Sequence, residues 1–179
     1  MKQELVGILI GIAIIFGIAS AGNAESKRTD PAWTIQIGYS PVFANAYWSD
    51  EDGTVSNFFG PVHGGSMSFD WRSKGHWGVQ VPIGINSTKK DTFINVGVNT
   101  LAHFLNSDTK VDPYAILGAS WFFSPNKDDL NLPFMGLANL GLGIRGYFSK
   151  NVGMYAEGII HPLIIINVFE TKIGLSIRF

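Results

Sequence analysis

The chain has 179 residues, a net charge of −1, no cysteine and only 15% charged residues. This length is enough for one domain with a full core. The charge balance excludes the strongly basic surface that nucleic acid requires, and the lack of cysteine excludes disulfides and thiolate metal sites. Because soluble domains have about 25% charged residues, the low value suggests that a large part of the surface does not face water.

The first 24 residues have the pattern of a secretory signal peptide. Lys2 precedes an apolar run at positions 5–18, and small residues follow, with cleavage sites predicted at residues 19–21 or 22–24. A membrane-spanning helix needs about 20 apolar residues, so an uncleaved anchor helix is the weaker alternative. We therefore assign residues 1–24 to a signal peptide, 25–32 to a polar lead-in and 33–179 to the folded domain.

From residue 33 onward, apolar and polar residues alternate in segments separated by turn-forming clusters. A period of two places successive side chains on opposite faces of a β-strand. The predicted strands cover residues 33–43, 62–71, 76–86, 92–104, 113–123, 135–148, 152–163 and 168–179. Their connections are short enough for antiparallel neighbours. The longest connections, residues 44–60 and 124–133, are predicted to be surface loops on the same side of the sheet.

The aromatic residues of the apolar face fall near the strand ends, in two bands. One band contains Trp33, Trp71, Trp77, Phe104, Phe148 and Phe179, and the other contains Phe43, Trp121, Phe123 and Phe169. Two aromatic girdles around an aliphatic band are typical of outer-membrane barrels. The opposite face is rich in Gly, Ser and Asn, which suit the crowded interior of an eight-stranded barrel. The apolar face is therefore predicted to point outward.

The predicted fold class is all-β: an eight-stranded antiparallel up-and-down transmembrane β-barrel preceded by a cleavable signal peptide. An open sheet edge is too costly in hydrocarbon, where each unpaired backbone group costs several kcal/mol. The eighth predicted strand is therefore expected to pair with the first.

Three runs of the chain resemble strands of the small eight-stranded outer-membrane barrels of Gram-negative bacteria, the group that includes the transmembrane domain of outer membrane protein A. Residues 141–148 and 153–158 resemble their sixth and seventh strands, and residues 173–179 resemble their closing strand. The resemblance implies a bacterial outer-membrane location with periplasmic termini and extracellular long loops. It also implies contact with outer-membrane lipid and lipopolysaccharide, and recognition of the strand that ends at Phe179 by the barrel-assembly machinery.

The inward face carries charged residues, which must be paired when they lie away from water. The predicted polar network of the lumen contains Asp70, Arg145, Tyr155, Glu157, His161, Glu170, Lys172 and Arg178. With a turn at residues 164–167, His161 is expected opposite Glu170, and Glu157 diagonal to Lys172. A proton- or ion-conducting path, or an acid–base pair at His161 and Glu170, is the alternative to a structural network.

The sequence favours a structural or interaction role, with loops 44–60 and 124–133 as contact sites for an unidentified extracellular partner. No catalytic residue, metal or cofactor is predicted. A lipid A-modifying hydrolase or acyltransferase is an alternative, although the chain lacks the His-x-Ser motif of the deacylase group. A soluble lipocalin-like lipid-binding barrel, with its apolar face inward, is the second alternative. Mass spectrometry of lipid A from cells with and without the protein would separate an anchor from an enzyme.

Overall fold

The computed structural model describes residues 32–50, 53–73, 75–88, 92–105, 109–123, 135–162 and 166–179, without the side chains of 44–50, 53–59, 135–136 and 166–167. The predicted signal peptide, the lead-in up to residue 31 and the loop at 124–133 lie outside these ranges. Within them, no helix has the length and hydropathy needed to cross a membrane.

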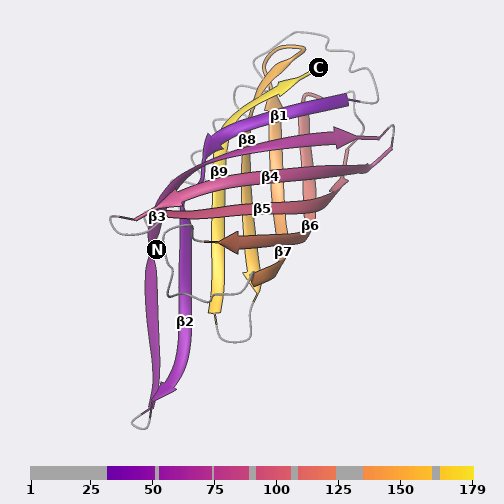
Figure 1. The fold of residues 1–179 in the computed structure, drawn as a ribbon. Helices are drawn as coiled ribbons and strands as arrows, with labels where there is room; N and C mark the ends of the chain where they lie inside the picture. Colours follow the sequence, from indigo (N-terminus) through magenta and orange to yellow (C-terminus); the bar gives the residue numbers. More distant parts are fainter. Residues whose placement is uncertain are drawn as a thin grey trace.

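The described residues form one antiparallel sheet that closes on itself (Figure 1). Its strands are β1 (Ala32–Tyr39), β2 (Val42–Asp50), β3 (Gly53–Arg72), β4 (Trp77–Ser87), β5 (Thr92–His103), β6 (Val111–Phe123), β7 (Met135–Tyr147), β8 (Val152–Pro162) and β9 (Ile166–Arg178). Strands β1 and β2 share one place in the wall, because both pair with β3 on one side and with β9 on the other. The predicted closed barrel of eight antiparallel strands is therefore confirmed.

The wall closes where β1 meets β9. The pairing runs from Thr34 opposite Arg178 to Tyr39 opposite Ile173. Beyond its end, the backbone N–H of Phe179 donates to the carbonyl oxygen of Trp33 at 2.9 Å. The expected pairing of the last predicted strand with the first is confirmed.

The first predicted strand is interrupted at Ser40 and Pro41, which separate β1 from β2. Proline has no backbone N–H and cannot donate to a sheet ladder. The wall nevertheless stays joined here, because Ser40 N donates to Gly64 O at 2.9 Å and Thr171 N donates to Pro41 O at 3.1 Å. The register between this composite strand and β9 continues unchanged across the break, with Val42 opposite Glu170.

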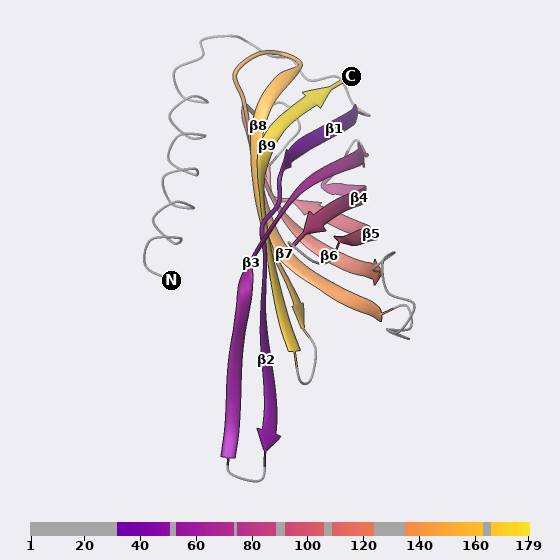
Figure 2. The ribbon, with the colours of Figure 1, turned by 60° about the vertical axis from the view of Figure 1, so that its left-hand side comes forward.

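The prediction of a loop at residues 44–60 is wrong. Its backbone forms a β-hairpin, from Ala44 opposite Phe59 to Asp50 opposite Gly53. Figure 2 shows this hairpin of β2 and β3 projecting well beyond the other strands. The segment contains Tyr47, Trp48, Val55, Phe58 and Phe59, which are residue types that favour strands. A hairpin that continues two paired strands is held by the backbone hydrogen bonds between those strands and needs no buried face. The polar residues of the segment therefore did not prevent strand formation.

A β-bulge marks the point where the hairpin leaves the wall. The register changes from Val42 opposite Val62 to Ala44 opposite Phe59, so β3 has one more residue than β2 over this step. Gly60 lies in the bulge with φ of 139°, a conformation that residues with a side chain rarely adopt.

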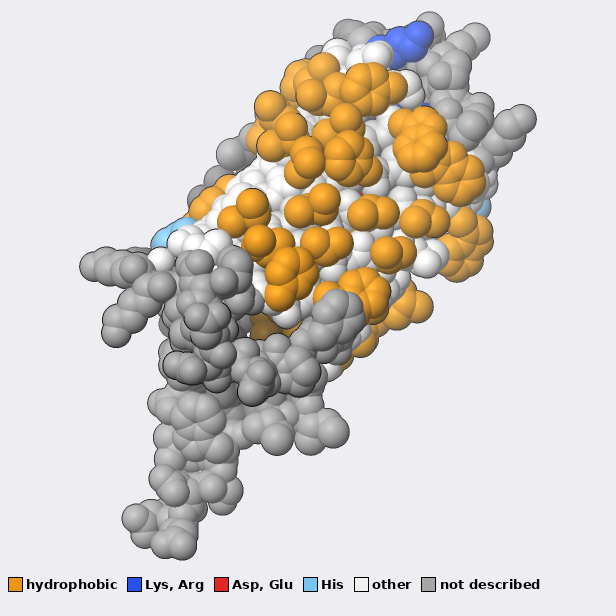
Figure 3. All heavy atoms as spheres, viewed as in Figure 1, with side chains coloured by type: hydrophobic (Ala, Val, Ile, Leu, Met, Phe, Trp, Pro, Cys, Tyr) orange, Lys and Arg blue, Asp and Glu red, His pale blue; other side chains and the backbone are white. Residues whose placement is uncertain are grey.

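The barrel is apolar outside and polar inside. In β4, exposed and buried residues alternate along nearly the whole strand. Large apolar side chains on the outer wall are exposed, including Leu142 at 65%, whereas Asn139 and Arg145 of the same strand are at most 2% exposed. In Figure 3, hydrophobic side chains cover most of the visible wall, and among the coloured residues Lys and Arg appear only near its upper end.

Inside the barrel, a glycine makes room for the ring of Tyr114. Gly143 on β7 lies opposite Tyr114 on β6. A Cβ at position 143 would lie 2.4 Å from two carbons of the Tyr114 ring. Tyr114 is fully buried, and its hydroxyl donates to Glu157 Oε1 at 2.6 Å, so the ring has no free space into which to move.

We expect Gly143→Ala to lower the free energy of unfolding by about 1–3 kcal/mol, because overpacking forces the Tyr114 ring from its place. Urea unfolding of the protein in detergent or lipid vesicles measures this change. Gly158→Ala on β8 is the matched control, since its Cβ would have no non-adjacent neighbour nearer than 3.8 Å. Equal effects of the two substitutions would contradict the close packing described for Tyr114.

Candidate functional site

The residues of the predicted polar network are all buried inside the barrel. They come from β3, β7, β8 and β9, and they are Asp70, Arg145, Tyr155, Glu157, His161, Glu170, Lys172 and Arg178. Because side chains from strands on different sides of the barrel contact one another here, the candidate site is the lumen itself.

The buried charges of the described residues balance. The buried acids are Asp70, Asp112, Glu157 and Glu170, and the buried bases other than histidine are Arg72, Arg145, Lys172 and Arg178. Removing a charge from water costs several kcal/mol unless an opposite charge and hydrogen bonds compensate it. Because the buried acids and the buried bases are equal in number, their charges can compensate one another away from bulk water.

Arg145 lies at the centre of the network. Its guanidinium forms an ion pair with Asp70, across the barrel on β3, and its Cζ lies 4.5 Å from the centroid of the Tyr114 ring. Tyr114 in turn donates from its hydroxyl to Glu157 Oε1 at 2.6 Å. These contacts join β3, β6, β7 and β8 through the interior, independently of the backbone ladder.

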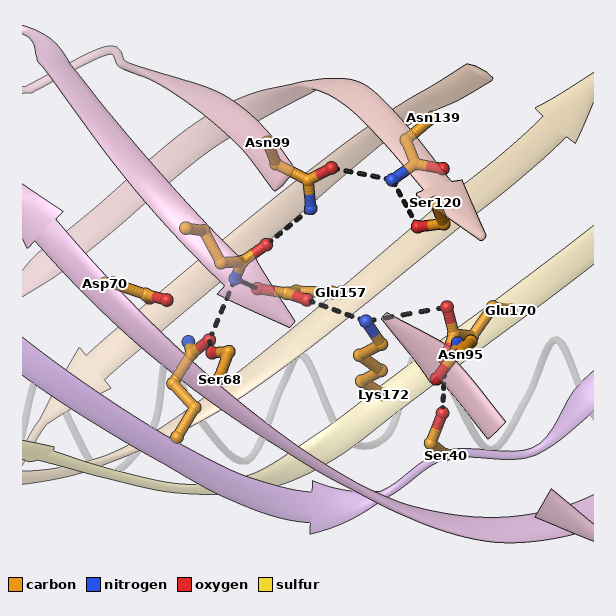
Figure 4. Close-up of polar contacts among 12 residues, drawn as sticks. Ser40, Ser68, Asp70, Asn95, Asn99, Ser120, Asn139, Glu157, Glu170 and Lys172 are labelled. Carbon is orange, nitrogen blue, oxygen red and sulfur yellow. Dashed lines mark hydrogen bonds and ion pairs between the residues drawn. The ribbon is translucent and has the colours of Figure 1, made fainter. Parts of the chain in front are cut away.

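Lys172 lies between two carboxylates (Figure 4). Its Nζ is 4.0 Å from Glu157 Oε2 and 3.5 Å from Glu170 Oε2. Glu170 also accepts hydrogen bonds from Ser40 Oγ at 2.6 Å and from Asn95 Nδ2 at 3.3 Å. The ammonium group therefore links the central charges to the barrel end from which the hairpin projects.

The predicted register between β8 and β9 is wrong, because the turn between them is not where it was expected. Glu157 lies directly opposite Lys172, and His161 lies opposite Val168. The two strands pair up to Pro162 opposite Asn167, so the turn is centred one residue earlier than expected. His161 still approaches Glu170 diagonally, with 3.5 Å between Nε2 and Oε2. Turn geometry sets register in a hairpin, and alternation alone does not reveal it.

A chain of side-chain amides connects Glu157 to His161. Gln80 Nε2 donates to Glu157 Oε1 at 2.9 Å, and Asn99 Nδ2 donates to Gln80 Oε1 at 2.8 Å. Asn139 Nδ2 donates to Asn99 Oδ1 at 2.6 Å, and Asn139 Oδ1 lies 2.7 Å from His161 Nδ1. Figure 4 shows the part of this chain that runs from Glu157 to Asn99 and Asn139. The predicted network omitted these uncharged residues, although they share the inward face of their strands.

A second ionic cluster lies toward the end of the barrel where the C-terminus lies. Asp112 Oδ1 is 3.1 Å from Arg72 Nη1 and 2.9 Å from His103 Nδ1. Arg72 Nη2 also donates to the carbonyl oxygen of Leu105 at 2.7 Å. The sequence interpretation missed this cluster because it placed Asp112 in a turn, whereas β6 already begins at Val111. Asp112 and Tyr114 are both even-numbered residues of β6, so alternation places their side chains on the same, inward face. This alternation was the signal in the sequence that could have revealed the cluster.

The aromatic residues of the two predicted bands lie on the outer wall near the strand ends. At the end with the C-terminus, Trp33 lies opposite Trp71, and Phe179 N bonds to Trp33 O. Trp77, Phe104, Phe148 and Phe179 are exposed. At the other end, the Phe43 and Phe169 rings are 6.4 Å apart between centroids, Phe123 is exposed, and Trp121 lies opposite Val96.

The arrangement is suited to holding the barrel together from within. Ion pairs join Asp70 to Arg145, Lys172 to Glu157 and Glu170, and Asp112 to Arg72 and His103, and the Tyr114 ring packs against the Arg145 guanidinium. His103 and His161 are buried, so neither imidazole reaches a lipid outside the wall. Among the described residues, no group of three or more His, Asp or Glu side chains could hold a metal ion.

We expect Asp70→Asn to lower the free energy of unfolding by about 3–5 kcal/mol, because it leaves the Arg145 charge buried without its partner. Urea unfolding again measures the change. Lys150→Gln, in the exposed turn after β7, should change it by no more than about 0.5 kcal/mol. The double substitution Asp70→Asn with Arg145→Gln should cost less than the sum of the single ones. Strict additivity would contradict a direct pair.

Comparison with known proteins gives likeness in structure only. No family model matches the sequence, and no curated protein matches it. The N-terminal β-barrel domain of OprF from Pseudomonas aeruginosa aligns with a TM-score of 0.57 and 17% identity, over 84% of this chain and 98% of that one. The outer membrane protein OprG from the same species has a TM-score of 0.56 and 12% identity, over 87% and 99%.

The attachment invasion locus protein Ail of Yersinia pestis, solved in complex with the heparin analogue sucrose octasulfate, aligns with a TM-score of 0.54 and 18% identity. The alignment covers 84% of this chain and all of Ail. Each neighbour is covered almost completely, so the likeness extends over the whole barrel. The chain therefore has the fold of the small eight-stranded outer-membrane β-barrels.

Proposed function

We propose that the chain is an integral protein of a bacterial outer membrane, with a filled lumen and a role in structure or interaction rather than in transport or catalysis. The observation that supports this most strongly is the polarity of the barrel. Exposed apolar side chains such as Leu142, Leu117 and Leu175 cover the wall, while the charged groups are buried. This arrangement suits a surrounding of hydrocarbon.

The soluble lipocalin-like alternative requires the opposite polarity. It needs the apolar face of the closing strand to line an inner cavity. Instead, Ile173 and Leu175 are 38% and 51% exposed, and Lys172, which directly precedes Ile173, is buried. In water, so large a contiguous apolar surface would drive aggregation.

The hairpin of β2 and β3 is the part of the molecule best placed to meet a partner. Beyond Ala46, β2 has no described partner other than β3, since its pairing with β9 ends at Ile166. The outer edge of the hairpin therefore offers backbone N–H and C=O groups to a further strand. Its sequence includes Tyr47, Trp48 and Phe58, of the aromatic type that is enriched in protein interfaces.

In the proposed orientation, the termini face the periplasm and the hairpin and residues 124–133 lie outside the cell. Lipopolysaccharide and outer-membrane lipid surround the wall, and the barrel-assembly machinery recognises the closing strand. The resemblance of residues 173–179 to the closing strands of outer-membrane barrels supports this assignment. The neighbour Ail, solved with a heparin analogue, supports the idea that a barrel of this fold can act in binding.

The proposal predicts that the purified full-length protein folds into lipid vesicles and migrates faster on detergent gels before boiling than after it. Closed barrels resist unfolding in detergent at room temperature, because every strand is paired on both sides. Protein that stays in the soluble fraction, with one migration before and after boiling, would rule out the membrane assignment.

The hairpin assignment predicts a specific cross-link on intact cells. A photo-reactive residue at position 49, near the tip of the hairpin, should give a discrete adduct with a partner molecule. The same residue at position 138, which is exposed on the wall of β7, is the control and should give none. Identical patterns from the two positions, or no adduct from position 49, would remove the hairpin as a contact site.

A further inference from the structure

Four polar side chains lie in a row across neighbouring strands on the outside of the barrel. They are Tyr39 on β1, His63 on β3, Ser87 on β4 and Thr92 on β5, and together they are called the polar row below. His63 lies opposite Ser87, and Ser87 lies opposite Thr92. Tyr39 pairs with Gly65 and therefore reaches His63 diagonally.

The polar row borders the apolar wall on the hairpin side. Two residues nearer the barrel centre, the outward positions of β1 and β4 are Ile37 and Ile85, which are 53% and 54% exposed. In the other direction, the β3 bulge at Gly60 begins the hairpin. In the proposed membrane orientation, the row lies where hydrocarbon gives way to lipid headgroups.

Tyr39 and His63 hold each other in a defined geometry. The Tyr39 hydroxyl and His63 Nδ1 are hydrogen-bonded, and the two rings stack with 5.9 Å between centroids and 21° between planes. Both side chains are exposed on the outer wall. When Tyr39 donates to Nδ1, the imidazole proton is on Nε2, so the tyrosine selects the tautomer that offers an N–H at the outer surface.

Two hydroxyl groups continue the row beside this pair. Ser87 Oγ and Thr92 Oγ1 are 3.3 Å apart, and Ser87 also donates to the carbonyl oxygen of Thr88 at 3.1 Å. Side chains directly opposite each other in an antiparallel sheet have Cβ atoms about 4.5–5.5 Å apart, so Ser87 lies within reach of a group bound at His63. None of the four residues is acidic, so an anion at this place meets no like charge from the row.

Elsewhere on the outer wall, the same end of the barrel carries aromatic side chains at the corresponding positions. On β2 and β9 the corresponding positions carry Phe43 and Phe169, whose rings pack against each other. A uniform interface with lipid would need only such aromatics. The four hydrogen-bonding side chains of the polar row lie over β1, β3, β4 and β5.

We propose that the polar row binds the phosphate of a lipid headgroup. His63 Nε2–H, with its tautomer selected by Tyr39, donates to one phosphate oxygen, and the hydroxyls of Ser87 and Thr92 rotate to donate to others. The lipid chains then lie along the apolar wall next to Ile37 and Ile85. This inference rests on the proposed membrane function and gives it a ligand class and a place on the wall.

Native mass spectrometry of the full-length protein, folded in detergent with equal amounts of phosphatidic acid and diacylglycerol of the same acyl chains, tests the proposal. We expect retention of phosphatidic acid over diacylglycerol. His63→Phe should weaken this retention about tenfold, as expected for losing one hydrogen bond to a charged group. Tyr39→Phe should weaken it by a smaller factor, because it removes only the hydrogen bond that selects the His63 tautomer. His76→Phe, at an exposed histidine near the opposite end, is the matched control and should leave it unchanged.

Nuclear magnetic resonance of ¹⁵N-histidine protein adds a second readout. The Nε2–H form of His63 should dominate, should respond to phosphatidic acid, and should decrease in population in Tyr39→Phe, which keeps the ring stack and removes only the hydroxyl. Equal retention of the two lipids, or a preference that survives His63→Phe, would overturn the proposal. A response to inorganic phosphate without a preference between the lipids would also overturn the headgroup assignment.

Gel migration before and after boiling, recorded for every variant, separates this test from the test of the membrane function. A wild-type protein that folds into membranes but does not distinguish the two lipids refutes the polar row alone. A wild-type protein that fails to fold into membranes refutes the proposed function itself.

Discussion

Closure of the hydrogen-bonded wall is the constraint on which the rest of this structure depends. The composite strand of β1 and β2 pairs with β9 over nearly its whole length within the wall, and it holds there even across Pro41, where one donor is missing. A medium without hydrogen-bonding partners tolerates no unpaired backbone. Once the sheet is closed, most of the outer face can be apolar, and the charged residues buried within the wall must then share one narrow interior.

That interior explains why the charges occur as a connected set. Arg145 and Asp70 bring together β7 and β3, which are not neighbours in the wall. Lys172 lies between Glu157 of the neighbouring strand β8 and Glu170 of its own strand. The amides of Gln80, Asn99 and Asn139 complete the contacts where no charge is available. Small residues such as Gly143 give space to the larger rings. Charged, amide and aromatic side chains thus occupy the interior together.

The surface features converge on one end of the barrel. The hairpin of β2 and β3 leaves the wall at the Gly60 bulge, and the polar row of Tyr39, His63, Ser87 and Thr92 borders the wall just beside it. A phosphate held at the row would anchor a lipid next to the base of the hairpin. The membrane surface and the proposed contact site would then be coupled through a few residues of β1 and β3.

The sequence by itself determined which side chains share a face, because a period of two allows only one division of them. The aromatic bands and the small polar residues then indicated that the polar face points inward. All eight predicted network residues, from Asp70 to Arg178, are accordingly inside. Only the tertiary structure decided which of them meet. The partners of His161 depended on a turn register that alternation does not encode. The pairing of Asp112 with Arg72 and His103 was likewise not visible, because these residues are distant in the sequence and meet only across strands. The hairpin at residues 44–60 likewise became visible only in the fold, since its strands are held by each other's backbone rather than by an apolar face.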